Sequence, residues 1–275
     1  MRTLIIGDLH CRSIWKDIVA KEGNSCDRIV FLGDYTCPRE VQLSDPTDAC
    51  GFLYEVLDYK DKNPDKVVLL RGNHDLGSLG YYWAQCWPQD HPKVQQYWQT
   101  NDVKNWFLKN SQWVYRIPDT NIVCSHAGVG EKFLENVQQY LDRIGFYNSF
   151  EDKGFNQCQI YLWTIENINN IEPCELFGFT DDNPFDTCGE SKTQPCTWIR
   201  PQTLMDYGVK DIIHVVGHTP VGIITNLKEE CLKYSSKDEI DIYKNQNSPD
   251  IWCCDCLMNN QYLIIEDNKF IPSKI

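Results

Sequence analysis

Four short runs of the sequence place potential metal ligands beside glycine. They are GDLH at Gly7 to His10, GDY at Gly33 to Tyr35, GNHD at Gly72 to Asp75 and GHTP at Gly217 to Pro220, and Val123 to Gly128 has a similar form. Aspartate, asparagine and histidine side chains in such a set can bind divalent cations. An asparagine amide oxygen suits hard cations and is rare in structural zinc sites. The chemistry that these residue types favour is therefore the binding of hard or borderline metal ions.

The runs are expected to meet in one cleft, because each follows a short apolar stretch. Val67 to Leu70 precedes GNHD, and similar stretches precede the other runs. Short β-rich stretches that end in glycine predict buried strands with their turns at one sheet edge. Helices are predicted between the first strands, at 13–21 and from Asp45 to about Asn63, and this alternation favours a largely parallel sheet.

The later part of the chain has a less regular pattern. It predicts a helix at 93–109, a hairpin at 113–125, a helix at 131–144, strands at 211–216 and 221–225, a polar loop at 229–249, and a closing hairpin of 251–256 with 261–266. The stretch 145–195 has no sustained period, and we expect it to be an insertion over the mouth of the cleft. We expect one domain, 1–275, that carries this insertion, since α/β folds of this length often form one domain.

The ordered motifs resemble those of the calcineurin-like metallophosphoesterases. That family has GDxHG, GDxVDRG, GNHE or GNHD, HGG or HAG, and GHTP in this order, and the branch most similar to this chain contains bacterial and phage Ser/Thr protein phosphatases and diadenosine tetraphosphatases. Five ordered motifs are far more specific than one. The resemblance implies an α/β fold, a four-layer αββα sandwich with two mixed β-sheets.

The resemblance also implies a site for two divalent metal ions. Manganese is the first expectation, with iron or zinc as alternatives. Two such ions about 4 Å apart can activate a bound water and hold the oxygens of a phosphate ester. In the family pattern, the first ion is held by Asp8, His10 and Asp34. The second ion is held by Asp34, Asn73, His126 and His218, so Asp34 is shared.

Three further residues match positions that act on the phosphate ester in the family. His74 matches the general acid that protonates or orients the leaving-group oxygen, a role that suits a side chain with a pKa near neutrality. Arg71 and Arg200 resemble arginines that contact phosphate, and a planar guanidinium can bind two phosphate oxygens at once. A salt bridge is the alternative role for Arg71, and simple exposure before Pro201 is the alternative for Arg200.

Two positions depart from the family pattern. Cys37 and Pro38 stand where GDxVDRG has the aspartate that orients the catalytic histidine and the arginine that binds phosphate, and Arg39 lies one place later. GHTP has Thr219 and Pro220 in place of the second histidine of the nuclease and phosphodiesterase form GHxH. The second departure favours the phosphatase and nucleotide-hydrolase branch.

These features leave three functions open. The first is hydrolysis of phosphate monoesters, with a phosphorylated protein, nucleotide or small ester as substrate. The second is hydrolysis of a nucleotide or polynucleotide end, such as a dinucleoside polyphosphate or a cyclic phosphate. The third is a metal-bound scaffold that recognises a phosphorylated partner, which Cys37 keeps open.

Size, charge and hydropathy exclude other classes. The chain has 275 residues, 42% of them hydrophobic, and a formal net charge of -13 without a basic cluster. We therefore expect no extended nucleic-acid binding, because such binding depends on neutralising phosphates. No secretory signal or membrane-spanning stretch is visible, so we expect a cytoplasmic protein.

The 14 cysteines are expected to be reduced thiols that pack as small hydrophobic side chains. Cys253 and Cys256 have a CxxC spacing within a strand pattern, which favours a structural role over a redox or zinc site. Four cysteines in or directly after the insertion could hold a metal, although their spacing matches no zinc pattern: Cys158, Cys174, Cys188 and Cys196. His214, within a predicted strand, is expected to be a core histidine.

Overall fold

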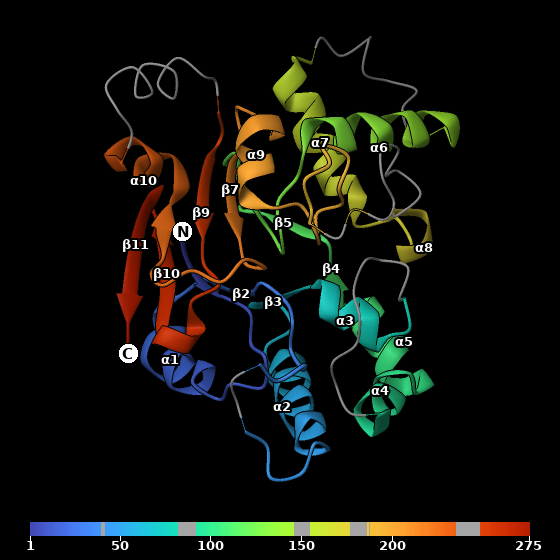
Figure 1. Cartoon of the computed structure of the whole chain (residues 1–275), viewed down its shortest axis with the longest axis vertical. Coiled ribbons are helices and arrows are strands. Elements are labelled where there is room, and N and C mark those ends of the chain that lie inside the picture. Colours follow the sequence, from blue (N-terminus) through green and yellow to red (C-terminus); the bar gives the residue numbers. More distant parts are fainter. Residues whose placement is uncertain (40–41, 82–91, 146–154, 177–185, 187, 235–247) are drawn as a thin grey trace. The chain divides into compact units, whose positions relative to one another are not determined.

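A computed structural model of the chain forms two compact units (Figure 1). It describes residues 1–39, 42–81, 92–145, 155–176, 186, 188–234 and 248–275. The first unit comprises Met1–Gln112, Val216–Thr225 and Cys253–Ile275, and the second comprises Trp113–Val215 and Asn226–Trp252. The chain therefore crosses between the units several times.

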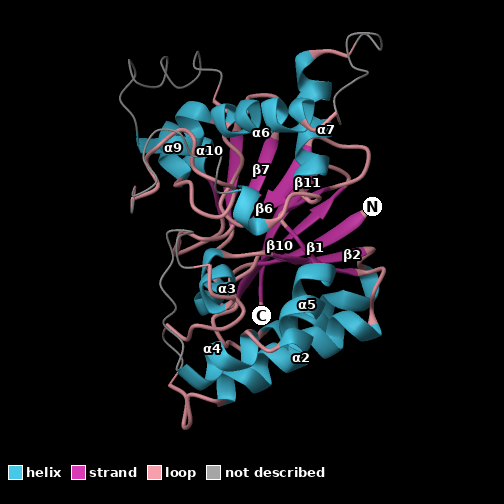
Figure 2. Cartoon of the chain, turned by 90° about the vertical axis from the view of Figure 1, so that its right-hand side faces the viewer, coloured by secondary structure: helices cyan, strands magenta, loops and turns pink. Residues whose placement is uncertain are grey.

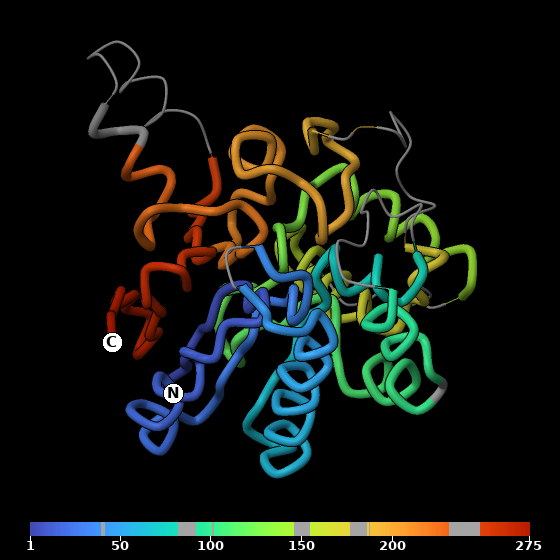
Figure 3. Tube along the Cα trace, turned by 60° about the horizontal axis from the view of Figure 1, so that its bottom comes forward, coloured from blue at the N-terminus to red at the C-terminus, as the bar shows by residue number. Residues whose placement is uncertain are grey.

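The first unit is built on a six-stranded sheet of order β11-β10-β1-β2-β3-β4. Its strands are β1 (Arg2–Ile6), β2 (Arg28–Phe31), β3 (Val67–Leu70), β4 (Ser111–Gln112), β10 (Gln261–Glu266) and β11 (Lys269–Lys274). The first four are parallel, β10 runs antiparallel beside β1, and β11 runs antiparallel beside β10. The C-terminal strand β11 thus lies on the same sheet as the N-terminal strands. The trace in Figure 3 shows the two ends of the chain near each other.

Most helices of the first unit lie between its parallel strands, and one short 3₁₀ helix precedes β10. They are α1 (Trp15–Glu22), α2 (Asp48–Lys62), α3 (Asn73–Ser78), α4 (Pro92–Trp98), α5 (Asn101–Asn110) and the 3₁₀ helices η1 (Gly23–Ser25) and η4 (Leu257–Asn259). Figure 2 shows α2, α4 and α5 gathered on one side of this sheet. Leu53 and Val56 of α2 are buried with Phe31 of β2 in one hydrophobic core, as expected for an amphipathic helix. This packing fixes the ends of β1, β2 and β3, which the turns GDLH, GDY and GNHD follow.

The second unit has a five-stranded sheet of order β5-β6-β7-β9-β8. Its strands are β5 (Val114–Arg116), β6 (Ile122–Ser125), β7 (Ile213–Val216), β8 (Thr225–Asn226) and β9 (Asp250–Cys253), and its helices are α6 (Glu131–Arg143), α7 (Gln157–Ile168), α8 (Pro173–Leu176), α9 (Pro201–Tyr207) and α10 (Leu227–Tyr234). The pair β5 and β6 is the predicted hairpin, antiparallel with Tyr115 opposite Cys124. Helix α7 packs against α6 and β5.

Several predicted elements differ from the structure. The single helix expected at 93–109 is divided into α4 and α5, because Thr100 takes a ψ of 141° that no α-helix contains. The predicted strand 221–225 reduces to β8, and α10 begins where a polar loop was expected, although 235–247 lie outside the described residues.

Two helices lie within the stretch 145–195, although its sequence showed no sustained period. Helix α7 begins with a capping box, in which Asn156 Oδ1 accepts from the Gln159 N–H at 3.0 Å and Gln159 Oε1 accepts from the Asn156 N–H at 2.9 Å. Residues 146–154, 177–185 and 187 of this stretch lie outside the described part of the chain. Its position over a cleft remains a prediction, as does the single domain.

The predicted hairpin of 251–256 with 261–266 is wrong. Strand β9 belongs to the five-stranded sheet, whereas β10 pairs with β1 in the six-stranded sheet. The hairpin partner of β10 is β11, and Asp267 and Asn268 form the connecting turn with φ of 49° and 61°. Such a two-residue turn with positive φ at both positions is typical of tight hairpins.

The α/β fold class with two sheets and flanking helices is confirmed. Among the described residues, none of the helices combines the length and the hydropathy needed to cross a membrane.

Candidate metal centre

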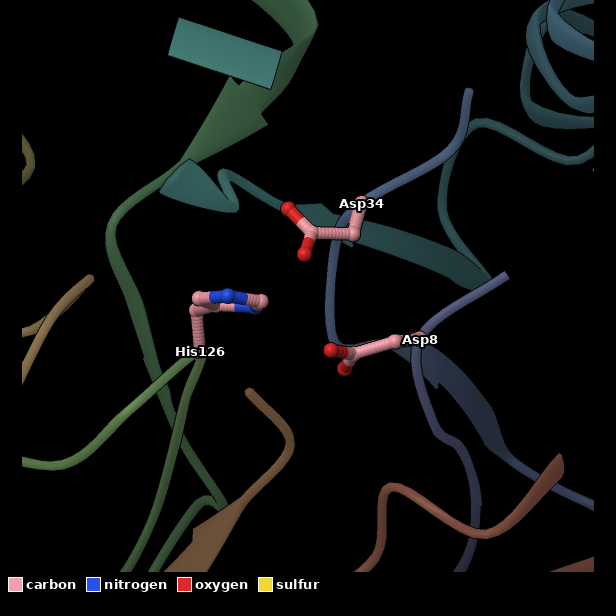
Figure 4. Close-up of side chains that lie close together, drawn as sticks. All are labelled: Asp8, Asp34 and His126. Atoms are coloured by element: carbon pink, nitrogen blue, oxygen red, sulfur yellow. The ribbon is translucent and has the colours of Figure 1, made fainter. Parts of the chain in front are cut away.

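Two carboxylates come together where the first parallel strands end. Asp8 follows β1 and Asp34 follows β2, and because these strands are parallel their carboxyl ends lie at one sheet edge. A carboxylate oxygen of Asp8 lies within 4.8 Å of one of Asp34. Both side chains are fully buried and project to the same side of the two strands in Figure 4.

Main-chain hydrogen bonds join the two turns that carry these aspartates. The His10 N–H donates to the Asp34 carbonyl at 2.7 Å, and the Cys11 N–H donates to the Tyr35 carbonyl at 3.1 Å. His10 and Asp34 have φ values of 43° and 52°, and His218 has 64°. Aspartate and histidine enter this left-handed region more readily than most residues, and it is frequent at functional sites.

His10 is oriented by the backbone of Cys37. Its Nδ1–H donates to the Cys37 carbonyl at 2.8 Å, and its Nε2 lies 3.6 Å from Asp34 Oδ2. Burial lowers the pKa of His10 to about 3. A neutral imidazole with Nδ1–H fixed to a carbonyl presents the Nε2 lone pair, which is the form that binds metals.

Asn73 and His218 approach the same two carboxylates. Asn73 is the first residue of α3, and its Oδ1 lies 3.0 Å from His218 Nδ1. The His218 N–H donates to Asp8 Oδ2 at 2.9 Å. The first unit therefore brings together five of the six predicted metal ligands: Asp8, His10, Asp34, Asn73 and His218.

Asp75 has a structural role that the sequence analysis did not predict. Its carboxylate accepts three main-chain hydrogen bonds, from the N–H groups of Gly72 (2.8 Å), Asp34 (2.9 Å) and Tyr35 (3.0 Å). The His74 N–H in turn donates to Asp34 Oδ1 at 3.0 Å. Asp75 therefore joins the GNHD turn to the GDY turn.

Glycines in two of the motifs are required by this close approach. A Cβ atom at Gly72 would overlap the carboxylate and main-chain nitrogen of Asp34, and one at Gly217 would overlap the carboxylate of Asp8. Any other side chain at these positions would displace a predicted ligand.

Asp255 is a further carboxylate of the site. It follows β9, is 4% exposed, and its Oδ2 lies 3.7 Å from Nη1 of Arg39. Burial raises the pKa of Asp8 well above its ordinary value, and the charges of Asp255 and Asp34 raise it further. Burial, opposed by Arg39, raises the pKa of Asp255 to about 6. The predicted strand 251–256 includes this carboxylate, whereas β9 ends at Cys253 and leaves Asp255 in the turn that follows.

The crowded carboxylates fit a divalent cation. Like charges in a buried site disfavour ionisation, and a bound cation reverses that effect. The donor set of carboxylates, a neutral imidazole and an amide oxygen suits Mn²⁺, Fe or Zn²⁺.

His74 and Arg71 occupy different surroundings in the first unit. His74 is 8% exposed, its ring meets the His10 ring edge to face at 5.6 Å between centroids, and its Nε2 lies 3.4 Å from Nη2 of Arg39. Arg71 donates from Nε to Ser111 Oγ at 3.0 Å and from Nη2 to the carbonyls of Leu108 and Ser111. These bonds tie Arg71 to the end of α5, and its contact with phosphate remains a prediction.

His126 and Arg200 belong to the second unit. His126 follows β6 and is fully buried, and Gly128 beside it has a φ of 122°. Arg200 caps α9, donates from Nε to the Cys188 carbonyl at 3.3 Å, and lies over the Trp198 ring at 5.6 Å. The roles of both residues remain predictions.

The buried cysteines and His214 match their expected structural roles. All described cysteines are free, and burial raises the pKa of Cys253 and of Cys256 to about 12, so neither is a thiolate at neutral pH. Burial lowers the pKa of His214 to about 4, as expected for a histidine in the core.

A family model now accounts for these motifs. The model described as calcineurin-like phosphoesterase matches residues 1–254. The chain is a calcineurin-like phosphoesterase. As a member of this family it is a metal-dependent phosphoester hydrolase that acts on phosphorylated substrates.

Solved structures similar to this phosphoesterase include two enzymes of related description. A metallophosphoesterase from Sphaerobacter thermophilus is 16% identical, with a TM-score of 0.41, and the alignment covers 100% of this chain and 88% of that chain. The phosphatase domain of the Legionella effector WipB is 13% identical, with a TM-score of 0.36, and the alignment covers 70% of this chain and 71% of that one. Comparison with curated proteins gave no match.

Proposed function

We propose that this phosphoesterase hydrolyses phosphate monoesters with two divalent metal ions. The observation that supports the proposal is the close approach of Asp8 and Asp34 beside His10, Asn73 and His218, all buried, with the pKa of Asp8 raised by burial and then by its charged neighbours. Such a cluster of carboxylates is costly to bury without cations.

The proposed ligands are divided between two ions. Asp8 and His10 would hold the first, Asn73, His126 and His218 would hold the second, and Asp34 would contribute to both. When bound, the ions supply charge that activates the attacking water and neutralises the phosphoryl oxygens. Manganese is the proposed metal, with iron and zinc as the alternatives that metal analysis would distinguish.

The chain itself supplies the contacts to the ester. His74 faces the leaving-group oxygen and donates to it, and Arg71 and Arg200 are the proposed phosphate contacts. The bonds that hold Arg71 to Ser111 and Leu108 keep its guanidinium in a fixed direction, which suits orientation of a substrate.

Asp34→Asn provides the first test. The amide retains the size of the carboxylate and removes the charge that both ions would share, so we expect metal content to fall and turnover on p-nitrophenyl phosphate with Mn²⁺ to drop by about a hundredfold or more. The matched control is Asp65→Asn, an exposed residue of the first unit. Full metal loading and turnover of Asp34→Asn would overturn the proposal.

The substrate class requires a second experiment. A panel of phosphopeptide, phosphorylated sugar, diadenosine polyphosphate and 2′,3′-cyclic nucleotide, each with Mn²⁺, separates monoester hydrolysis from nucleotide-end hydrolysis. We expect turnover on the monoesters. Turnover confined to the diadenosine or cyclic substrates would show that the chain hydrolyses nucleotide ends instead of monoesters. Bound metal without turnover on any ester would favour a scaffold that recognises a phosphorylated partner.

A further inference from the structure

The residue that orients the catalytic histidine in related motifs is absent from its expected position. Cys37 occupies that position, its side chain is buried, and its main-chain carbonyl accepts a hydrogen bond from His10 Nδ1–H. A thiol cannot replace a carboxylate as an ionic hydrogen-bond partner. His74 therefore needs a different residue to fix its ring.

Arg39 contacts the His74 ring from the same turn. Its Nη2 lies 3.4 Å from His74 Nε2, and its side chain is 28% exposed. A guanidinium has donors only, so Nε2 must be the acceptor. It follows that the proton of the neutral ring is on Nδ1.

Asp255 holds the other side of Arg39. Its Oδ2 lies 3.7 Å from Arg39 Nη1, and Asp255 itself is fixed by the turn after β9, where its carbonyl accepts from the Val221 N–H at 2.9 Å. Asp255 is 4% exposed, so its carboxylate cannot turn out into solvent. An arginine between a buried carboxylate and an imidazole has little freedom to rotate.

We propose that Asp255 and Arg39 are positioning residues that set the orientation and tautomer of His74, in place of the aspartate missing at position 37. Among the described residues, His74 Nδ1 is buried and has no hydrogen-bond partner. The pair thus fixes Nδ1 as the protonated nitrogen of the neutral ring. The inference rests on the proposed function, because the histidine that the pair orients is the one proposed to act on the phosphate ester.

The tautomer can be measured without turnover. In metal-free protein labelled with ¹⁵N-histidine, the ring nitrogens of His74, one of six histidines, are assigned by comparison with His74→Gln. We expect a pyrrole-type Nδ1 and a pyridine-type Nε2 in the wild type, and a mixture of tautomers in Arg39→Met. A pyrrole-type Nε2 in the wild type would overturn the inference.

Kinetics provide a second, independent measure. Arg39→Met is expected to lower kcat about tenfold to a hundredfold with little change in metal content, since partners that orient a functional histidine have effects of this size. Arg39→Lys is expected to keep a higher kcat than Arg39→Met. Guanidinium added to the Arg39→Ala variant is expected to restore part of the kcat that this variant loses. Asp255→Asn is expected to lower kcat by a smaller factor and to lose most of its effect in the Arg39→Met background.

The controls separate this inference from the proposed function. Arg28→Met changes an arginine at the start of β2, away from these contacts, and should leave kcat unchanged. If Asp34→Asn and His74→Gln abolish turnover while Arg39→Met does not, only the positioning role is wrong. If neither of the first two variants lowers turnover, the proposed function is wrong.

Discussion

A buried aspartate organises loops in each unit, but the two loops differ in what they join. In the first unit, Asp75 accepts main-chain hydrogen bonds from Gly72, Asp34 and Tyr35. These donors lie on two turns that are about 40 residues apart in sequence. Asp75 therefore joins segments that only the folded sheet brings together.

In the second unit, Asp186 is the centre of a local loop. Its carboxylate accepts from the N–H groups of Cys188, Gly189 and Ser191, at 2.7 to 3.1 Å, and from Gln194 Nε2 at 3.1 Å. The same loop holds Arg200, whose N–H donates to the Gly189 carbonyl at 3.1 Å. All its partners lie within a few residues.

The two loops differ in whether their hydrogen bonds depend on distant parts of the chain. A loop built from neighbouring residues keeps its hydrogen bonds when distant parts of the chain are loosened. A long-range centre loses all of its bonds together, and the ligands beside it move as a set. We therefore expect substitutions at Asp75 to affect both stability and metal binding, and substitutions at Asp186 to affect mainly the loop that carries Arg200.

Asp75→Ala should have the largest effect. It leaves three buried N–H groups without an acceptor, at about 1–3 kcal/mol each before relaxation, so we expect the free energy of unfolding to fall by about 3–5 kcal/mol. Metal content and turnover should fall with it, because Asp34 and His74 are displaced. Urea denaturation followed by tryptophan fluorescence gives the stability, and Asp65→Ala serves as the control. A loss below about 1 kcal/mol would show that Asp75 is not the centre of these turns.

The pH dependence of the metal-free protein sharpens the comparison. A carboxyl whose pKa is raised on folding stabilises the fold fully below its unfolded pKa and loses that contribution as pH rises through the folded pKa. For Asp255 the window runs from about 4 to about 6. We expect Asp255→Asn to be more stable than the wild type above this window, by about 2 kcal/mol, and equally stable below it.

Urea titrations of both proteins at pH 4, the lower edge of the window where the difference should be small, and at pH 7.5, each with EDTA, measure this contrast. Addition of Mn²⁺ at pH 7.5 should reverse it, because the cation restores the favourable charge balance around the wild-type carboxylates. A difference that is the same at both pH values would show that the charge of Asp255 is not buried against its neighbours.

Asp186→Ala should have a moderate and local effect. Water can replace part of the lost acceptor, since Cys188 is exposed, so we expect the free energy of unfolding to fall by about 1–2 kcal/mol. KM for p-nitrophenyl phosphate should rise, while metal content stays at the wild-type level. Loss of bound metal in Asp186→Ala would show that this loop supports the metal centre as well as Arg200.

The contrast between the two loops also explains what could be predicted from the sequence. Asp8 and Asp34 were found because each stands beside glycine directly after an apolar strand, and the sheet was predictable from the same pattern. Asp75 was part of a quoted motif, yet its function depends on N–H groups of the GDY turn, which no local pattern reveals. Asp255 is not found from the sequence because it falls inside the predicted strand 251–256, whereas β9 ends at Cys253 and leaves Asp255 in the turn that follows.

The start of α7, unlike the role of Asp255, is marked by a local pattern in the sequence. Asn156 and Gln159 are three residues apart and form a local signal for a helix start, so this helix was readable from the sequence within a stretch that we expected to lack regular structure. The division of 93–109 into α4 and α5 was harder to predict, because threonine is common both within helices and before them. Local signals thus identify where elements begin, whereas long-range pairing decides which turns converge.

Gly51→Ala should have the smallest effect and the opposite sign. Gly51 lies within α2, where a new Cβ would meet no atom within 4 Å. Alanine is favoured over glycine in a helix interior by about 0.5–1 kcal/mol, so we expect stability to rise by that amount with turnover unchanged. The reverse change, Ala20→Gly in α1, should lower stability by a similar amount. If Gly51→Ala instead lowered metal content, α2 would be coupled to the ligand turns, and the long-range sensitivity assigned to Asp75 would belong to the whole first unit.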